Sequence, residues 1–285
     1  MKRLGLATLV ALASLSSVLS PASLAGQRRV PMMLDSLSAP SHRIDYIPFG
    51  VGENLRYKVK AGIFSVGEAR MSIGPLDSIN GYPTYVAEWH IEGGIPFYSM
   101  DSKYRTWMDV ETLVSRKFVK DQHEGGRKRY REYDFYPEDR TWHRIDYDST
   151  GTLPTSLPLD EISFVYFART LPLEVGDRYT FHRFFQDDGN PVVLDVIRKD
   201  ERSVGAGKFP TIVVRPTIQT RGLFAEGGEA EIHFSDDDRR LVVYMKSKLP
   251  GMNLTLHLEE IEEGVRVDRT ELALGTPDRG PGGKR

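Results

Sequence analysis

The sequence of 285 residues contains no cysteine. Small proteins of oxidising compartments are often held together by disulfides, so this chain must rely on its hydrophobic core. A chain of this length buries ~70–75% of the surface that its unfolded form exposes, which is enough for such a core. The absence of cysteine also excludes the lipid-modified cysteine that follows the export signal of a bacterial lipoprotein.

Long apolar runs are scarce, and the one near the N-terminus has the features of an export signal. Two basic residues precede an apolar core at residues 4–19, and Ser23-Leu24-Ala25 provides the small residues that a signal peptidase requires. We therefore expect residues 1–25 to be a Sec-type signal peptide. The remaining chain lacks the ~18–20 apolar residues of a membrane helix. These features predict a periplasmic or secreted protein without an integral membrane span.

An excess of charge of one sign is also missing, because 38 basic and 40 acidic residues leave a net charge of −2. This balance argues against a general affinity for polyanions, and we expect no nucleic-acid partner outside the cytoplasm. The seven histidines lack the spacing of a zinc site, and the acidic turns lack the spacing of a calcium loop. The GxSxG motif of many serine hydrolases is absent too. We assign no catalytic residue, metal or cofactor.

The dominant pattern is two-residue alternation of apolar and polar side chains, which is typical of half-buried strands. Residues 55–59, 85–91, 179–185 and 252–258 show it most clearly. Asn80-Gly81 and Asp188-Gly189 predict two-residue hairpin turns, because these residue types tolerate positive φ. About a dozen such segments predict a mainly β protein with curved antiparallel sheets, open or half-barrel-like. The predicted core includes the following residues: Tyr57, Trp89, Trp107, Phe118, Phe181 and Leu256.

One segment departs from this pattern. Residues 159–171 place apolar side chains at helical spacing, with Asp160 as the N-terminal cap and Pro172 as the stop. We expect one short central helix, and we expect Arg169 to pair with a residue on a strand. The predicted organisation is a flexible segment at 26–47, a single β-rich domain at 48–274 and a disordered tail at 275–285. The domain has two sub-halves that divide near 150–172.

Basic residues gather within 16 positions around Gly125-Gly126, interleaved with aromatic residues. In a hairpin these side chains would line adjacent strands, where they could contact anionic lipid headgroups or an acidic polysaccharide. The alternative is the charged outer face of an edge hairpin, which prevents aggregation. The candidate residues for contact with an anionic surface are Arg116, Lys120, Arg127, Arg129 and Arg131.

Aromatic residues are frequent between residues 82 and 185. If the sheet curves, its concave face would carry many of them, and such a groove suits an acyl chain. The alternative is an ordinary hydrophobic core. The candidate ligand-binding residues are Trp89, Tyr104, Trp107, Phe118, Tyr133 and Trp142.

Several stretches, in their order along the chain, resemble one bacterial family. They are residues 48–57 (PFGVGENLRY), 65–71 (SVGEARM), 101–109 (DSKYRTWMD), 158–173, 205–210 (GAGKFP) and 234–241 (FSDDDRRL). Together they resemble the exported domain-of-unknown-function family numbered 3108. The resemblance implies an exported, mostly β protein, and it supplies no catalytic residues.

Three hypotheses on function follow. The first is a non-enzymatic cell-envelope protein that binds an apolar or amphipathic ligand, or an envelope partner, on a concave β face. Its candidate partners are a lipid, an envelope polysaccharide or an envelope protein. The second is an exported hydrolase that acts on a glycan or an ester, and the third is a structural scaffold. A hydrolase would need a pocket in which titratable groups with perturbed pKa values converge.

Overall fold

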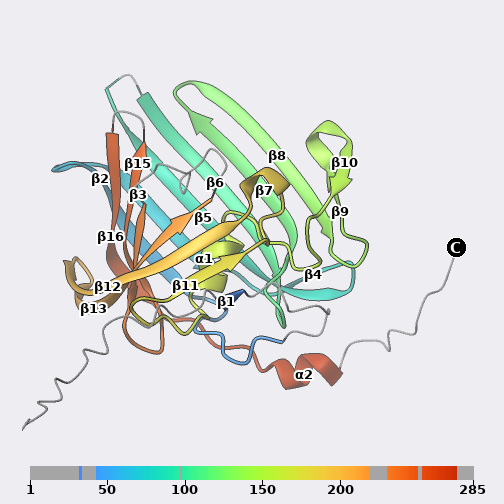
Figure 1. Ribbon diagram of the computed structural model, residues 1–285. Helices are drawn as coiled ribbons and strands as arrows, with labels where there is room; N and C mark the ends of the chain where they lie inside the picture. Colours follow the sequence, from blue (N-terminus) through green and yellow to red (C-terminus); the bar gives the residue numbers. More distant parts are fainter. Residues whose placement is uncertain (1–31, 34–42, 97, 219–229, 250–251, 275–285) are drawn as a thin grey trace, which may run out of the picture. The chain divides into compact units, whose positions relative to one another are not determined.

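The described strands form one continuous, open sheet (Figure 1). The computed structural model describes residues 32–33, 43–96, 98–218, 230–249 and 252–274, all within a compact unit of residues 31–285. The predicted signal peptide, residues 26–31 and 34–42 of the predicted flexible segment, and the predicted tail lie outside the described residues. The predictions for these parts stay predictions.

Ten strands precede the central helix and six follow it. The first group is β1 (Met32–Met33), β2 (Asn54–Ala61), β3 (Phe64–Ile73), β4 (Asp77–Ile79), β5 (Tyr82–Ile95), β6 (Tyr98–Asp109), β7 (Ser115–Glu124), β8 (Arg127–Tyr136), β9 (Thr141–Arg144) and β10 (Ser149–Thr152). The second group is β11 (Arg178–Phe181), β12 (Val192–Val204), β13 (Gly207–Thr217), β14 (Glu231–Ser235), β15 (Val242–Leu249) and β16 (Met252–Glu262). The helices are α1 (Ser163–Ala168) and α2 (Arg269–Leu274), with single 3₁₀ turns at Ile145–Tyr147 and Asp187–Gly189.

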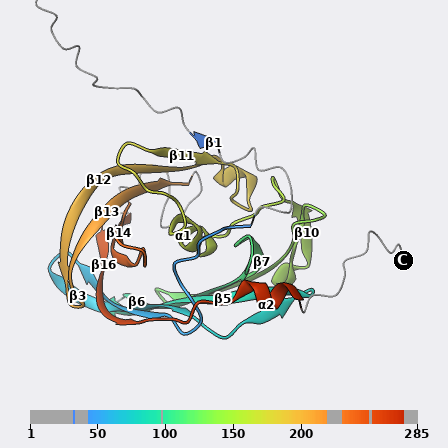
Figure 2. The same cartoon turned by 90° about the horizontal axis from the view of Figure 1, so that it is seen from below.

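The two groups of strands are joined because the last strand of the second pairs with β2 of the first. The order is β1-β11-β12-β13-β14-β15-β16-β2-β3-β5-β6-β7-β8-β9-β10, and β4 pairs with β5. Neighbours are antiparallel except β1 and β11, which are parallel. The strands curve around α1, as Figure 2 shows. The predicted fold class, a mainly β protein with a curved antiparallel sheet and a short central helix, is confirmed.

Turn geometry follows the sequence in the first group of strands. Asn80 and Gly81 have φ values of 51° and 80°, and Gly125 and Gly126 have values of 55° and 75°. Both pairs form the two-residue turns that suit the right-handed twist of the flanking strands. The prediction at Asp188-Gly189 is wrong, because these residues lie in a 3₁₀ turn between β11 and β12.

The central helix is shorter than its pattern predicts, with six residues that are all buried. Asp160 precedes it and accepts the backbone N–H groups of Ile162 and Ser163 at Oδ1. Its Oδ2 accepts the hydroxyls of Thr106, at 2.5 Å, and Ser115, at 2.7 Å. One buried carboxylate thus accepts the free backbone N–H groups at the start of α1 and connects the helix to β6 and β7.

The end of the helix is fixed by a buried ion pair. Arg169 donates from Nη1 and Nη2 to the two carboxylate oxygens of Glu53, at 2.6 and 2.8 Å. The Arg169 side chain is fully buried and that of Glu53 is 6% exposed. This contact joins residues 116 positions apart. The sequence predicts that Arg169 pairs with a residue on a strand; its partner is instead the residue just before β2.

Five of the six residues predicted for the core are buried, and Trp107 is the exception. Trp107 shares its face of β6 with Lys103 and Arg105, which are exposed. Its indole N–H donates to Asp77 at 2.9 Å, outside the core. The prediction for Trp107 is wrong because alternation shows which residues share a face but not which face packs inward.

Candidate ligand-binding site

The inner face of β7 and β8 changes from apolar to charged along its length. Phe118 and Tyr133 face each other across the strands and are both buried. Toward the hairpin turn the facing pairs are Lys120 with Arg131, then Gln122 with Arg129, then Glu124 with Arg127. The period of two keeps all of these side chains on one face of the sheet.

Three arginines of β8 form a row along this face. Arg127, Arg129 and Arg131 are all exposed, and in the described part of the chain none of their side chains has a hydrogen bond or ion pair. Alternate residues of a strand lie ~6.6–6.8 Å apart, so the row spans roughly 13 Å. We call Arg127, Arg129 and Arg131 the arginine row; its charges are available to an anionic ligand.

A recess of about 350 Å³ lies at the hairpin end of the arginine row. It is lined by Tyr98, Gln122, Glu124, Gly125, Arg127 and Arg129. Its wall is ordered by hydrogen bonds, since the Gln122 amide donates to both Tyr104 and Glu124 at 3.0 Å. Burial raises the pKa of Tyr104, so its hydroxyl stays neutral. The recess thus combines two guanidinium groups with a fixed set of polar groups.

Five of the six aromatic residues predicted to bind ligand face inward, and most of these pack against other side chains. Phe185, from the segment between β11 and β12, contacts Tyr133 with ring centroids 5.1 Å apart and Phe118 at 6.3 Å. Tyr133 also contacts Trp142 at 5.8 Å. These rings form an aromatic cluster, and the segment between β11 and β12 covers it.

The other predicted aromatic residues lie elsewhere. Trp89 and Tyr104 face each other across β5 and β6 and are buried. The indole N–H of Trp89 has no hydrogen-bond partner among the residues that the structure describes. Trp107 lies on the opposite face of β6, where Arg105 and Lys117 stack near its ring at 5.9 and 5.7 Å.

The five predicted basic residues separate into two sets. The first is the arginine row. The second is Arg116 and Lys120, which already have partners. Arg116 is 6% exposed and pairs with Asp109 and Glu138. The Lys120 ammonium pairs with Glu161 at 2.7 Å and lies 5.1 Å from the centre of the Tyr104 ring.

Acidic and hydroxyl groups converge at Asp160, but they are closed off from solvent. Ser115 and Ser163 contact each other at 2.8 Å, and both bind Asp160. All three residues have no exposed surface. Burial raises the pKa of Asp160 above its ordinary value, against the hydrogen bonds it accepts. This cluster secures the start of α1, and within the described residues no three of the His, Asp and Glu side chains group as metal ligands.

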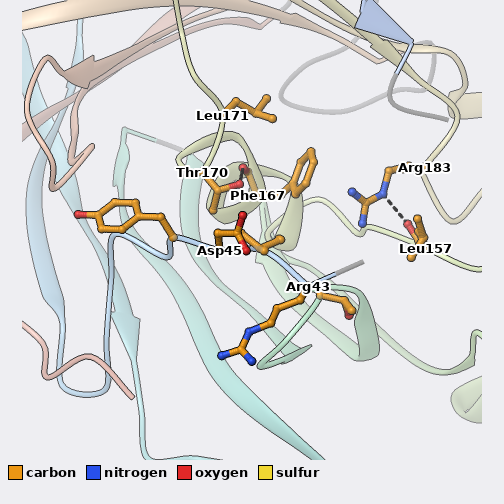
Figure 3. A pocket seen from close by; sticks show the side chains of 10 residues that line it. Arg43, Asp45, Leu157, Phe167, Thr170, Leu171 and Arg183 are labelled. Carbon is orange, nitrogen blue, oxygen red and sulfur yellow. Dashed lines mark hydrogen bonds between the residues drawn. The ribbon is translucent and has the colours of Figure 1, made fainter. Parts of the chain in front are cut away.

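A second recess, of about 290 Å³, lies beside the C-terminal end of α1 (Figure 3). Phe167 and Leu171 contribute apolar surface, and Arg183 lies with its guanidinium carbon 4.3 Å from the centre of the Phe167 ring. The Arg183 Nε donates to the Leu157 carbonyl at 2.8 Å, and Arg43 pairs with Glu111 at 3.2 Å. Arg43 and Arg183 of this recess both have protein partners, so the arginine row is the stronger candidate site for an anionic ligand.

The sequence did not indicate Tyr98, Gln122 and Glu124 as site residues. The local sequence does not distinguish them from other strand residues. Only the register of β6 against β7 brings them together. The two-residue turn at Gly125-Gly126 was the available signal, because it fixes which residues of β7 and β8 face each other.

The fold is similar to that of one solved structure, and two other structures match with lower scores. A β-barrel-like protein of the DUF1849 domain of unknown function from Brucella abortus matches with a TM-score of 0.53 at 12% identity, over 76% of this chain and 99% of that one. A hypothetical protein, CT021, from Chlamydia trachomatis matches with a TM-score of 0.34 at 7% identity, over 76% and 90%. A protein from Bacteroides fragilis, inferred to be exported and to have a YmcC-like fold, matches with a TM-score of 0.30 at 11% identity, over 76% and 99%.

No curated protein matches the sequence. Among the described residues, no helix is long and apolar enough to cross a membrane. The family model for "Protein of unknown function (DUF3108)" matches residues 56–259, which include β3 to β15 in full. The chain therefore belongs to the DUF3108 family, as its sequence motifs predict.

Proposed function

We propose that the protein is an exported, non-enzymatic protein of the cell envelope that binds the anionic head of an amphipathic ligand on its concave β face. The observation that carries this proposal is the arginine row beside the recess at Tyr98, Gln122 and Glu124. Three guanidinium groups on one face of a strand, with no partner among the described side chains, attract a phosphate or carboxylate group. The predicted signal peptide supports a location outside the cytoplasm.

The change from charged to apolar side chains along the inner face supports an amphipathic ligand. From the hairpin turn inward, the arginine row is followed by Tyr133, which is 5% exposed, and then by Phe135, which is 1% exposed. A bound head group at the arginines would therefore have apolar side chains on the side toward α1. Arginine suits this role because its planar guanidinium can donate two parallel hydrogen bonds to one phosphate.

The alternative of a hydrolase has less support. The set of acid and hydroxyl groups at Asp160 is buried, and the recess near the arginine row contains one acid, Glu124, whose Oε1 accepts hydrogen bonds from Ser102 and Gln122. A general acid–base pair needs two titratable groups within reach of one substrate. The recess is better suited to binding than to bond cleavage.

The test is calorimetric titration with two short-chain lipids, dihexanoyl phosphatidylglycerol and dihexanoyl phosphatidylcholine. We expect the anionic lipid to bind more tightly, and the variant Arg127→Gln/Arg129→Gln to lose about tenfold or more in affinity, because each charge-assisted hydrogen bond contributes roughly 1.5–3 kcal/mol. The matched control is Lys103→Gln/Lys128→Gln, which removes the same charge from exposed residues of the outer face. Equal loss in both variants, or no preference for the anionic lipid, would overturn the proposal.

A further inference from the structure

Two hairpin turns expose large apolar side chains. At the turn between β2 and β3, Ile63 is 88% exposed and Phe64 is 70% exposed. At the turn between β5 and β6, Ile95 and Tyr98 are each 41% exposed. The first turn does not need Ile63 or Phe64 for its geometry, since Gly62, with a φ of 60°, provides its positive φ. Grouped exposed apolar residues mark interaction surfaces.

The register of the sheet places these turns at the same end of the strands as the arginine row. Gly67 of β3 faces Gly93 of β5, near the end of β5 at Ile95. Met100 of β6 faces Glu124 of β7, just before the Gly125-Gly126 turn. Figure 1 shows the β5–β6 and β7–β8 turns at the same end of the strands.

The start of β6 and the β7–β8 turn at Gly125-Gly126 are in direct contact. The Gly125 N–H donates to the Ser99 carbonyl at 2.9 Å. A Cβ atom at Gly125 would lie 3.0 Å from the Tyr98 ring, so this position admits the aromatic side chain because it is glycine. The exposed face of Tyr98 is thus adjacent to Arg127 and Arg129, with which it lines the recess.

We propose that the end of the sheet that carries these turns docks on the surface of a lipid bilayer that contains anionic lipids. We call Ile63, Phe64, Ile95 and Tyr98 the apolar tips. Peripheral proteins bind bilayers by inserting apolar side chains at the interface while neighbouring basic residues attract anionic head groups. The apolar tips provide the first element. The second is provided by Arg127 and Arg129, which are both exposed.

The combination distinguishes a bilayer from a protein partner. The apolar tips lie on two turns from separate hairpins, so they offer two separate apolar points rather than a continuous apolar area, and each point can enter a fluid interface independently. Tyrosine is also favoured at the membrane–water interface because its ring is apolar and its hydroxyl is polar. Docking in this orientation turns the recess beside the arginine row toward the bilayer, so that a ligand could enter from it.

Vesicle flotation tests the docking. The protein is purified after export, and its N-terminus is determined by mass spectrometry so that residues 4–19 cannot serve as the anchor. We expect flotation with vesicles of phosphatidylcholine containing phosphatidylglycerol, and partitioning about tenfold weaker for Ile63→Asn/Phe64→Asn, because large apolar side chains drive insertion. The control is Val265→Asn, which changes a 77% exposed side chain. Val265 pairs with Val51, at the opposite end of β2 from Ile63.

Site-specific labelling provides a second measurement. The sequence contains no cysteine, so Phe64→Cys and Val265→Cys each carry a single polarity-sensitive fluorophore. We expect a blue shift on vesicle addition at residue 64 and none at residue 265. No flotation, flotation unchanged by Ile63→Asn/Phe64→Asn, or equal shifts at both labels would overturn the docking. The lipid titration described above uses other residues and soluble lipid, so docking and ligand binding can fail separately.

Discussion

The buried ion pair between Glu53 and Arg169 provides a quantitative test of how the strands and the helix are held together. The Glu53→Gln variant keeps the shape of the side chain and removes its charge. The Arg169 guanidinium, which is fully buried, would then lack its countercharge. In the folded protein, burial acts to lower the pKa of Arg169, but the Glu53 carboxylate raises it above its ordinary value. The variant therefore leaves a buried cation that nothing neutralises.

The expected magnitude follows from this burial. Removing one partner of a buried ion pair costs about 3–5 kcal/mol, because the remaining charge stays desolvated. The matched control is Glu260→Gln. It breaks the pair of Glu260 with Arg56, whose side chains are 57% and 51% exposed. An exposed pair contributes about 0.2–1 kcal/mol, so the control should change stability little.

Urea unfolding followed by tryptophan fluorescence measures both variants, with m-values compared to confirm that the same transition is observed. A third variant, Glu53→Gln/Arg169→Met, removes the buried charge altogether and should recover a large part of the loss. If Glu53→Gln lowers the free energy of unfolding no more than Glu260→Gln does, the buried ion pair does not hold the helix to the sheet. The same conclusion follows if the double variant is as unstable as the single one.

Two further predictions concern the interior and the response to acid. Phe185→Ala should destabilise the protein by about 3–5 kcal/mol, because Phe185 fills the aromatic cluster between Tyr133 and Phe118; urea unfolding measures this, with Ile63→Ala as the exposed control, and a loss below 1 kcal/mol would contradict it. His233 is buried, and burial lowers its pKa from 6.5 to about 4. Because its folded-state pKa is depressed, the unfolded chain binds the proton first, so stability should fall as the pH drops from 6.5 to 4, by up to about 3 kcal/mol. The His233→Gln variant should lose less over this window, and equal losses in both proteins would refute this role.

Much of the local structure follows from the sequence because its causes are local. Alternation of side chains predicts β2, β5 and β16, since a strand with one packed face must repeat every two residues. Asn80-Gly81 predicts its turn because both residues tolerate positive φ. Asp160 predicts the start of the helix because its carboxylate can accept free backbone N–H groups.

The candidate site depends on contacts that local pattern does not specify. The basic residues between 116 and 131 are similar in sequence, yet Arg116 is buried with acidic partners while the arginine row is exposed. What separates them is their position along the strands. Arg116 lies near α1 and the turn after β6, and the arginine row lies toward the opposite end. Trp107 has a different reason, because alternation does not specify which face of a strand packs inward, and its face of β6 is the outer one.

The sequence by itself determined the family, the β class, the turns at Asn80-Gly81 and Gly125-Gly126, and the position of the central helix. Only the tertiary structure decided which face of each strand packs inward, which residue pairs with Arg169, and which turns share an edge. The physical reason is distance along the chain. Glu53 and Arg169 are 116 residues apart, and the sheet is continuous because β16 pairs with β2. Such contacts form only when the whole sheet curves around α1, and no short window of sequence contains them.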